Sequence, residues 1–361
     1  MGRGEAVTQR TLDPPFGGSN PPAPTRKILW KAMDISEAEL IRWIRSLASP
    51  FQKKVLVGIG DDAAVIKGRE GYSYLFTTDT LVENVHFRWE FVHPYQLGWK
   101  ALAVNASDIA AMGGYPVFAL VTFGIPTSFL SSRVKEVYKG LVDLSTRLNL
   151  EISGGDIVRS RIFFISISVV GEVEAGRAVL RSGAKPGDSV YLTGDIGRAA
   201  TGFLSLKEGK KLHLPSATDS LRRRWLMPFP RIKEAREIAM GGVATAMIDL
   251  SDGLSSDLYH ILEESGVGAE IWEKNLPIAS ETEKVCHELN RSPLEVALHG
   301  GEDYELLFTA PATTNVEKIV SFQVTRIGKI LEESGLFLLN KKGERKKLKS
   351  GGWDHFLSTA P

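Results

Sequence analysis

Apolar positions follow helical and strand spacing in alternation through the first half of the chain. In DISEAELIRWIRSLA they recur every three or four residues, as on one face of a helix, whereas SYLFTTDTL has the short run typical of a strand. The predicted helices span 34–48, 96–113 and 131–149, and the predicted strands span 53–60, 73–81, 116–126, 150–158 and 163–173. Helices that alternate with strands over one domain's length predict an α/β fold.

A second unit with the same alternation begins near Gly176. The pattern predicts a turn and then a strand within 183–194, a strand running into a glycine turn at 245–253, a turn and a strand within 295–311, and a strand at 321–331. It also predicts helices at 196–209, 230–240 and 254–265, and a loop at 211–220. Cys286 falls in a further helical stretch, and the basic run at 341–349 is expected to be a solvated edge. The chain therefore predicts an N-terminal α/β domain at 33–175 and a C-terminal α/β domain at 176–361.

Residues 1–32 stand apart from both units. The stretch LDPPFGGSNPPAP within them is rich in proline, glycine and serine, which do not sustain a helix or a sheet. We expect residues 1–32 to form a disordered N-terminal tail that contributes no functional motif.

Composition and charge narrow the class of protein. Lys and Arg number 44 against 43 Asp and Glu, a net charge of +1, which argues against a nucleic-acid-binding or membrane-surface protein. No apolar stretch reaches the roughly 18 residues of a membrane span, and the N-terminus does not resemble a secretory signal. The single cysteine, Cys286, cannot form an intramolecular disulfide and fits a reducing, cytoplasmic setting.

Acidic residues recur beside glycine or small residues where predicted strands end. They are Asp62 in GIGDDAA, Asp79 in FTTDT, Asp156 in SGGDIV, and Asp249 and Asp252 in IDLSDG, joined by Asp108 from a helix, on the same face as Asn105. Strand ends are where α/β folds gather their ligands. Because unpaired carboxylates oppose one another's burial, such a group predicts divalent cations, and Mg²⁺ prefers oxygen ligands and phosphate.

Taken alone, each carboxylate has an ordinary explanation. Asp252 is well placed to cap a helix, Asp156 could be a turn residue, and Asp108 could be solvated, although its apolar neighbours favour burial. Of the adjacent pair Asp61 and Asp62, only one is expected to face a site, and we choose Asp62.

Two common nucleotide-binding motifs are excluded. The chain has no G-x-x-x-x-G-K-[ST], so it has no P-loop. Gly58, Gly60 and Ala63 match the dinucleotide pattern G-x-G-x-x-A, but two aspartates would face the pyrophosphate, and further glycines follow too soon for the required helix.

Four further residues have both a structural and a functional interpretation. His86 could pack beside Phe87 or donate to a phosphate, and Arg181 could be a surface residue or a bidentate phosphate clamp. Glu302, after two glycines, could open a turn or contact a ligand, and Trp353 could pack on the core or stack on a ring.

Seven motifs, taken in order, resemble the thiamine-monophosphate kinase family within the aminoimidazole-ribonucleotide synthetase superfamily. They are GIGDDAAVI, TTDTLVENVHF, KALAVNASDIAAMGGYP, SGGDIVRS, RSGAKPGDSVYLTG, IDLSDGLSSDL and GGEDYELLF. The resemblance runs from about Ile35 to the C-terminus. It implies two α/β domains with mixed sheets, the first binding ATP and Mg²⁺ and pairing its sheet with a second subunit's into a dimer barrel. It also implies direct transfer of the γ-phosphoryl group of ATP to thiamine monophosphate.

The resemblance further implies a role for individual residues. Mg²⁺ would be bound by Asp62, Thr77, Thr78, Asp79, Asp108, Asp156, Asp249 and Asp252, with Asp62, Asp79, Asp108 and Asp156 catalytic. ATP would contact Tyr138, Gly155, Arg181 and Ser251. Thiamine monophosphate would contact His86, Glu302 and Trp353.

Two alternatives stay open at this point: another ATP-dependent ligase or cyclase of the same superfamily, and a non-catalytic nucleotide-binding protein. Relatives that rely on a reactive cysteine near either terminus are disfavoured, because Cys286 lies in neither place. A phosphate oxygen is already ionised near neutral pH, so transfer to thiamine monophosphate needs no catalytic base. We expect a cytoplasmic homodimer that uses ATP and thiamine monophosphate.

Overall fold

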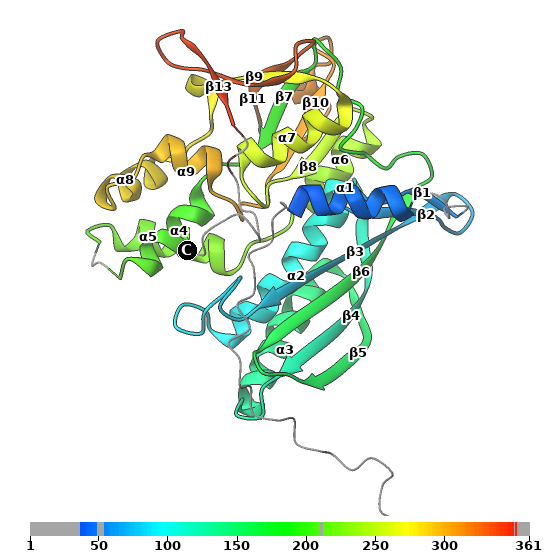
Figure 1. The fold of residues 1–361 in the computed structure, drawn as a ribbon, viewed down its shortest axis with the longest axis vertical. Helices are drawn as coiled ribbons and strands as arrows, with labels where there is room; N and C mark the ends of the chain where they lie inside the picture. Colours follow the sequence, from blue (N-terminus) through cyan, green and yellow to red (C-terminus); the bar gives the residue numbers. More distant parts are fainter. Residues whose placement is uncertain (1–36, 49–53, 210–211, 350, 352–361) are drawn as a thin grey trace, which may run out of the picture. The chain divides into compact units, whose positions relative to one another are not determined.

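The first half of the chain forms a six-stranded sheet with helices. The computed structural model describes residues 37–48, 54–209, 212–349 and 351, so the predicted tail and Trp353 lie outside the described residues. The elements are α1 (Glu37–Ala48), β1 (Val55–Val57), β2 (Ala64–Lys67), β3 (Tyr72–Val82), α2 (Pro94–Ala111), β4 (Tyr115–Ile125), α3 (Ser131–Leu148), β5 (Glu151–Arg159) and β6 (Phe164–Glu174). The strands pair in the order β1-β2-β3-β6-β4-β5, as Figure 1 shows for the last four. Only β4 and β5, which α3 connects, are parallel.

The second half forms a seven-stranded sheet in the order β13-β12-β9-β11-β7-β10-β8. Its elements are β7 (Ser189–Thr193), α4 (Arg198–Lys207), α5 (Pro215–Leu226), α6 (Ile232–Met240), β8 (Ala246–Asp249), α7 (Leu254–Ser265), β9 (Gly268–Trp272), η2 (Glu273–Asn275), α8 (Ser280–Glu288), α9 (Pro293–His299), β10 (Leu306–Ala310), η3 (Val316–Lys318), β11 (Val324–Leu331), β12 (Gly335–Leu339) and β13 (Arg345–Leu348). Strands β7 and β10 and the edge strand β8 are buried along their whole length. The predicted α/β class with mixed sheets is confirmed.

Helix α2 lies at the centre of the molecule. It begins with a capping box, in which the His93 side chain accepts from a backbone N–H and the Gln96 side chain accepts from the His93 backbone N–H. Almost all of its residues are buried, and it packs on β3, β6 and α3 and also contacts β8 of the second sheet. Its polar residues therefore lie in an apolar surrounding, where they need specific partners.

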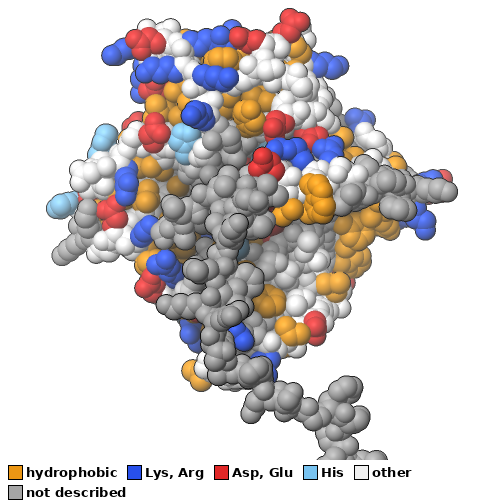
Figure 2. Space-filling model, viewed as in Figure 1, with side chains coloured by type: hydrophobic (Ala, Val, Ile, Leu, Met, Phe, Trp, Pro, Cys, Tyr) orange, Lys and Arg blue, Asp and Glu red, His pale blue; other side chains and the backbone are white. Residues whose placement is uncertain are grey.

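Within the described ranges, α2 covers one face of the six-stranded sheet and the other face is left open. Along β3, the alternate residues Ser73 and Leu75 are buried on the face that α2 covers. Phe76 lies on the opposite face and is 41% exposed. The register places Phe76 in one row with Phe118 of β4, which is 44% exposed, and Leu120 on the same strand is 52% exposed. On the face drawn in Figure 2, hydrophobic side chains gather on the right, where Figure 1 shows this sheet. No described part of the single chain therefore covers this apolar sheet face.

The structure corrects several expectations from the sequence. The loop expected at 211–220 is wrong in its second half, because α5 begins at Pro215, where a missing N–H costs little. Asp79 and Asp156 do not lie at strand ends: β3 stays paired with β6 to Val82, and β5 continues to Arg159. The sequence pattern also misses α9 and the strands β2, β9, β12 and β13.

Glycine explains how β5 runs on past Asp156, for which the sequence left a turn open as an alternative. A Cβ on Gly155 would lie 1.8 Å from the Val121 carbonyl oxygen, and its φ is +154°. Only a residue without a side chain can therefore bring β5 this close to β4.

No helix in the described ranges is both long enough and apolar enough to span a membrane.

Candidate functional site

Three carboxylates from separate segments meet at one point of the structure. Asp62 lies between β1 and β2, Asp108 in the last turn of α2, and Asp249 at the end of β8. One carboxylate oxygen of each lies within 4.8 Å of the other two. We call these three residues the acidic group.

Hydrogen bonds from β3 and α2 fix the position of the acidic group and join α2 to β3. Thr77 Oγ1 on β3 donates to Asp108 Oδ2 at 2.6 Å, and Ser107 Oγ donates to Asp249 Oδ2 at 2.5 Å. Asn105 Oδ1 accepts from the Asp79 backbone N–H at 3.0 Å. The predicted pair Asn105 and Asp108 does lie on one face of the helix, and this face joins α2 to β3 and to β8.

Burial and mutual repulsion act on the acidic group together. Burial raises the pKa of Asp108 well above its usual range, and the charges of Asp79, Asp249 and Asp62 add to the rise. Burial likewise raises the pKa of Asp249 to about 7, with Asp62 as the next cause. The fold therefore keeps these carboxylates buried and close together, and a bound cation would reduce the repulsion between their charged forms.

Arg181, in the segment between β6 and β7, contacts the acidic group directly. Its Nε and Nη2 donate to Asp62 Oδ1 at 3.1 and 2.5 Å, while its backbone N–H donates to the Asp61 carboxylate at 3.2 Å. Asp61 thus holds the loop, and the Asp62 side chain lies in the acidic group. The second oxygen, Asp62 Oδ2, is buried without a hydrogen-bond partner. An orphaned carboxylate oxygen beside two other carboxylates has the donor chemistry that Mg²⁺ binds.

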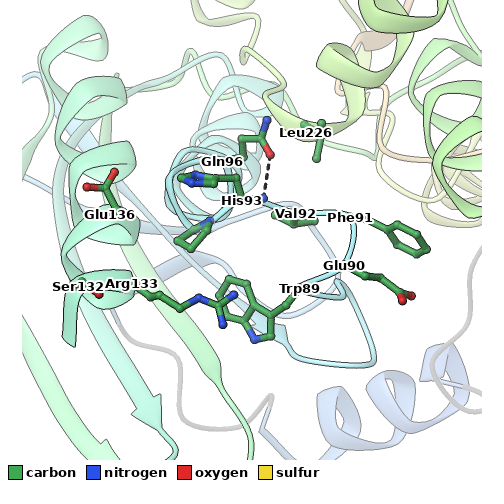
Figure 3. Close-up of a pocket in the computed structure, with 11 residues that line it drawn as sticks. Trp89, Glu90, Phe91, Val92, His93, Gln96, Ser132, Arg133, Glu136 and Leu226 are labelled. Carbon is green, nitrogen blue, oxygen red and sulfur yellow. Dashed lines mark hydrogen bonds between the residues drawn. The ribbon is translucent and has the colours of Figure 1, made fainter. Parts of the chain in front are cut away.

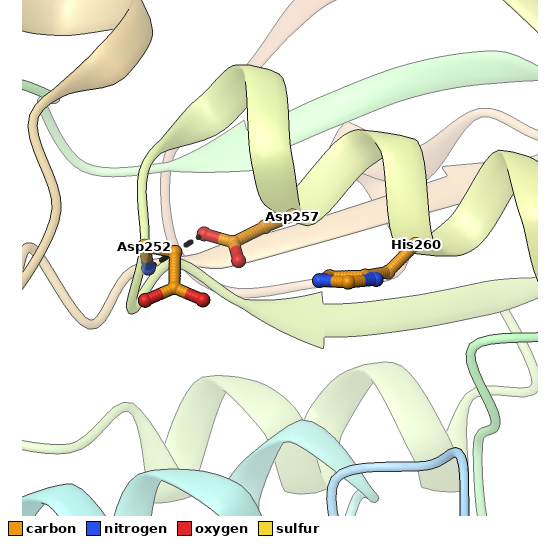
Figure 4. A group of neighbouring side chains, drawn as sticks. All are labelled: Asp252, Asp257 and His260. Carbon is orange, nitrogen blue, oxygen red and sulfur yellow. Dashed lines mark hydrogen bonds between the residues drawn. The ribbon is translucent and has the colours of Figure 1, made fainter. Parts of the chain in front are cut away.

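A second cluster surrounds Asp252, in the turn after β8. Figure 4 shows it with Asp257 and His260 of α7, and one ligand atom of each lies within 4.8 Å of the other two. Asp257 Oδ2 accepts from the backbone N–H groups of Asp252 and Gly253 at 3.2 and 3.0 Å, so it shapes this turn. Burial raises the pKa of Asp252 to about 7 and lowers that of His260 to about 4.

Four of the residues implied by the resemblance are not brought to the acidic group within one chain. The Thr78 side chain lies on the uncovered face of the sheet, where its Oγ1 donates to the Ile167 carbonyl and accepts from Ser168 Oγ. Gly155 and Asp156 lie on the edge strand β5, and Tyr138 lies on the exposed side of α3. Three strand spacings, about 14 Å, separate β5 from β3.

Of the residues assigned to thiamine monophosphate, the two that the structure describes lie in two loops. His86 follows β3, and its Nδ1 accepts from the Val82 backbone N–H at 3.0 Å, so a neutral ring presents Nε2–H as a donor. Glu302 precedes β10, and its backbone N–H donates to the carbonyl oxygen of Ser251 at 2.8 Å, which ties it to the turn holding Asp252.

Sequence reasoning missed two residues that contact Glu302. Its carboxylate pairs with Lys100 Nζ at 2.7 Å and accepts from Trp225 Nε1–H. The signal available for Lys100 was a single charged residue in the otherwise apolar first half of a helix.

The groove drawn in Figure 3 has a volume of about 610 Å³, and none of the predicted site residues that the structure describes lines it. It is lined by the segment from Trp89 to Gln96, by the start of α3 and by Leu226. Arg133 crosses it, with its guanidinium 4.3 Å from the centroid of the Trp89 ring. None of the carboxylates described above lines this groove.

Comparison with protein families gives two consecutive matches. Residues 60–173 match AIR synthase related protein, N-terminal domain, and residues 185–340 match AIR synthase related protein, C-terminal domain. The chain is 39% identical over 311 residues to thiamine-monophosphate kinase of Bacillus subtilis, covering 83% of this chain and 93% of that protein. It is 38% identical over 299 residues to the thiamine-monophosphate kinase of Aquifex aeolicus, covering 82% and 92%.

A solved structure supports the same relationship. The structure of AaThiL complexed with AMPPCP and TMP superimposes with a TM-score of 0.79 at 36% identity, covering 89% of this chain and 97% of that one.

Proposed function

Since this chain belongs to the thiamine-monophosphate kinase family, we propose that the acidic group and the Glu302 loop are the two ends of its active site. The enzyme transfers the γ-phosphoryl group of ATP to thiamine monophosphate and releases ADP and thiamine diphosphate. The observation that carries the site assignment is the convergence of Asp62, Asp108 and Asp249, whose oxygens lie within 4.8 Å although the chain brings them from three separate segments.

We assign Mg²⁺ binding to the acidic group, together with Asp79 and Asp252. The fit rests on the buried, unpartnered Asp62 Oδ2 and on the raised pKa values of the neighbouring carboxylates. A bound Mg²⁺ neutralises phosphate charge between two anionic reactants. Thr77 and Ser107 hold Asp108 and Asp249 in place by donating to them.

The nucleotide end is assigned to Arg181 and Ser251, with Gly155 and Tyr138 as further ATP contacts. Arg181 already donates twice to Asp62, so its guanidinium lies at the acidic group before any nucleotide binds. A planar guanidinium can hold two phosphate oxygens, which places ATP phosphates next to the carboxylates.

The acceptor end is assigned to His86, Glu302 and Trp353. A thiamine monophosphate oxygen is ionised near neutral pH, so the site needs donors that orient it and no base that deprotonates it. His86 fits that role, because its Nδ1 accepts from the Val82 backbone N–H, so a neutral ring carries its proton on Nε2.

We further propose that two copies of the chain associate through the uncovered face of the six-stranded sheet. Phe76, Phe118 and Leu120 are exposed there, and Asp156 lies on the same face in register with Thr122. Because one chain keeps Asp156 away from Asp79, a role for Asp156 in metal binding belongs with this homodimer. Sedimentation velocity should show a dimer that L120E converts to a monomer; a wild-type monomer would contradict the proposal.

The activity is tested by incubating the protein with ATP and thiamine monophosphate and measuring thiamine diphosphate, with Mg²⁺ and with EDTA. We expect product only with Mg²⁺. ATP consumption without thiamine diphosphate would favour another ligase or cyclase of the superfamily, and binding without turnover would favour a nucleotide-binding protein. A cytoplasmic location stays a prediction, in keeping with the lone, buried thiol of Cys286.

A further inference from the structure

We propose that Lys100 is a positioning residue of the thiamine-monophosphate end of the site, acting by holding the carboxylate of Glu302. The inference rests on the proposed function, because it takes Glu302 as a substrate contact. Lys100 itself is too deeply buried to touch a ligand, so its effect passes through Glu302.

The surroundings of Lys100 explain why it needs Glu302. Its side chain is 3% exposed in the middle of α2, and its Nζ lies 2.7 Å from Glu302 Oε1 and 4.0 Å from the centroid of the Trp225 ring. Burial lowers the pKa of Lys100, and the charge of Glu302 acts in the opposite direction. The ammonium is therefore stabilised by one carboxylate and one aromatic face.

Glu302 is fixed at both oxygens and at its backbone. Oε1 pairs with Lys100, and Oε2 accepts from Trp225 Nε1–H. Its φ of +67° is a left-handed conformation, and a Cβ on the preceding Gly301 would lie 2.2 Å from the Ser251 carbonyl oxygen. The Glu302 side chain is nevertheless 31% exposed. A carboxylate that is held this firmly and still reaches the surface is preorganised to bind a ligand.

A chain of aromatic contacts connects this arrangement to His86. Trp225 is tilted against Phe203 with ring centroids 4.9 Å apart, and Phe203 meets Phe91 edge-on at 6.4 Å. Phe91 and Phe203 line a small cavity of about 30 Å³ together with His86. His86 and Glu302, two of the three residues assigned to thiamine monophosphate, are thus connected through packed aromatic side chains, and Lys100 contacts one of these, Trp225.

Charge gives Lys100 a second effect on the substrate. Burial raises the pKa of Asp252, and the charge of Glu302 adds to that rise, so Glu302 lies within electrostatic range of the metal-binding carboxylates. An unpaired Glu302 would repel the incoming phosphate of the substrate. Lys100 makes the pair neutral and keeps the carboxylate oriented. Stability alone does not account for such a pair, because apolar replacements of buried ion pairs are often neutral or stabilising.

The test measures the two substrates separately in the K100M variant. We expect the KM for thiamine monophosphate to rise about tenfold or more, the cost of losing a charge-assisted contact, with the KM for ATP changed by less than about twofold. K329M, which removes an exposed lysine paired with Glu270 on β11 and β9, is the matched control and should leave both values unchanged. Equal rises in both KM values, or none, would overturn the proposal.

E302Q and the double variant K100M/E302Q separate this inference from the function it rests on. If Lys100 acts through Glu302, the double variant should be no worse than E302Q in its KM for thiamine monophosphate. Additive losses would overturn the role of Lys100. An unchanged KM in E302Q would instead overturn the assignment of Glu302 as a substrate contact.

K100Q provides a measurement that does not depend on the folding of K100M. Glutamine keeps a hydrogen-bond donor of similar length but lacks the charge, so its KM for thiamine monophosphate should lie between those of wild type and K100M. Should K100M not fold, K100Q is compared with wild type alone, and an unchanged KM for thiamine monophosphate would overturn the proposal. Thermal unfolding of each variant establishes which of them are folded.

Discussion

The two ends of the proposed active site differ in whether the protein itself balances the charge of their carboxylates. At the metal end, Asp62, Asp108 and Asp249 converge, and Arg181 donates to Asp62 alone among them. At the acceptor end, Glu302 is paired with the buried Lys100 and bonded to Trp225. The metal end is thus left with excess negative charge, whereas the acceptor end is neutralised by the protein itself.

This difference matches the two kinds of ligand proposed for the two ends, metal ions with a nucleotide at one and an organic phosphate at the other. Excess negative charge, held in place by Thr77 and Ser107, favours small cations that arrive with the nucleotide. A carboxylate that is oriented and charge-balanced by an ion-pair partner favours an organic substrate, because it accepts hydrogen bonds without adding net repulsion to the substrate's phosphate. The predictions below test this contrast, beginning with the largest expected effect.

D108N removes one negative charge from the metal end with almost no change in volume. We expect turnover to fall about 100-fold or more, the scale seen when one electrostatic contact to the transition state is lost. The measurement is the rate of thiamine diphosphate formation across a Mg²⁺ titration. D219N, at an exposed position of α5, should keep the wild-type rate. Near-wild-type activity of D108N at limiting Mg²⁺ would remove Asp108 from the metal site.

The metal end should also make stability depend on pH and Mg²⁺ together. Asp249 and Asp252 have pKa values of about 7 in the fold, against about 4 for an unfolded aspartate. The fold therefore favours their protonated forms, and the resulting stability is present below pH 4 and lost as the pH rises through about 7. In EDTA, the thermal midpoint should fall between pH 5 and pH 8.

Mg²⁺ binds the ionised carboxylates, so it should raise the midpoint more at pH 8 than at pH 6. D249N removes one of the titrating groups and should flatten the pH dependence measured in EDTA. A midpoint that rises with pH in EDTA would contradict the assignment of excess negative charge to this end.

R181K keeps the positive charge at the metal end but loses the planar geometry. We expect a loss of about 1–3 kcal/mol in the ATP dependence, which corresponds to a rise of roughly 5-fold to 160-fold in KM for ATP. The KM for thiamine monophosphate should change less, because His86, Glu302 and Trp353 are assigned to that substrate. An unaltered ATP dependence would reduce Arg181 to a structural partner of Asp62.

S107A makes the smallest change, the loss of one hydrogen bond to Asp249. That bond lowers the pKa of Asp249, so its removal should raise the pKa further and weaken Mg²⁺ binding. We expect about a threefold higher Mg²⁺ concentration for half-maximal activity, in line with one net hydrogen bond. Equal shifts in the Mg²⁺ requirement and in the KM for thiamine monophosphate would show that the two ends are not independent.

Much of the fold could be predicted because the local sequence shows which positions are apolar and at what spacing they recur. The helices expected at 34–48, 96–113 and 131–149 are confirmed as α1, α2 and α3, since each places apolar residues at helical spacing. The failures have local causes as well. Strands β9, β12 and β13 are short, and α5 begins inside a polar stretch where α/β patterning is weak.

For the site, the sequence determined the chemistry: aspartates beside small residues, a histidine after TTDT and a glutamate after two glycines are enough to indicate phosphate and divalent cations. Only the tertiary structure decided which of these residues meet. Thr77 and Thr78 are adjacent in the motif TTDT, but side chains alternate along a strand. Thr77 therefore donates to Asp108, whereas Thr78 lies on the opposite face of the sheet. The pairing of Lys100 with Glu302 joins a helix of the first half to a loop of the second. Such contacts depend on the packing of the whole chain, because no local pattern encodes which distant segment will lie against a given helix face.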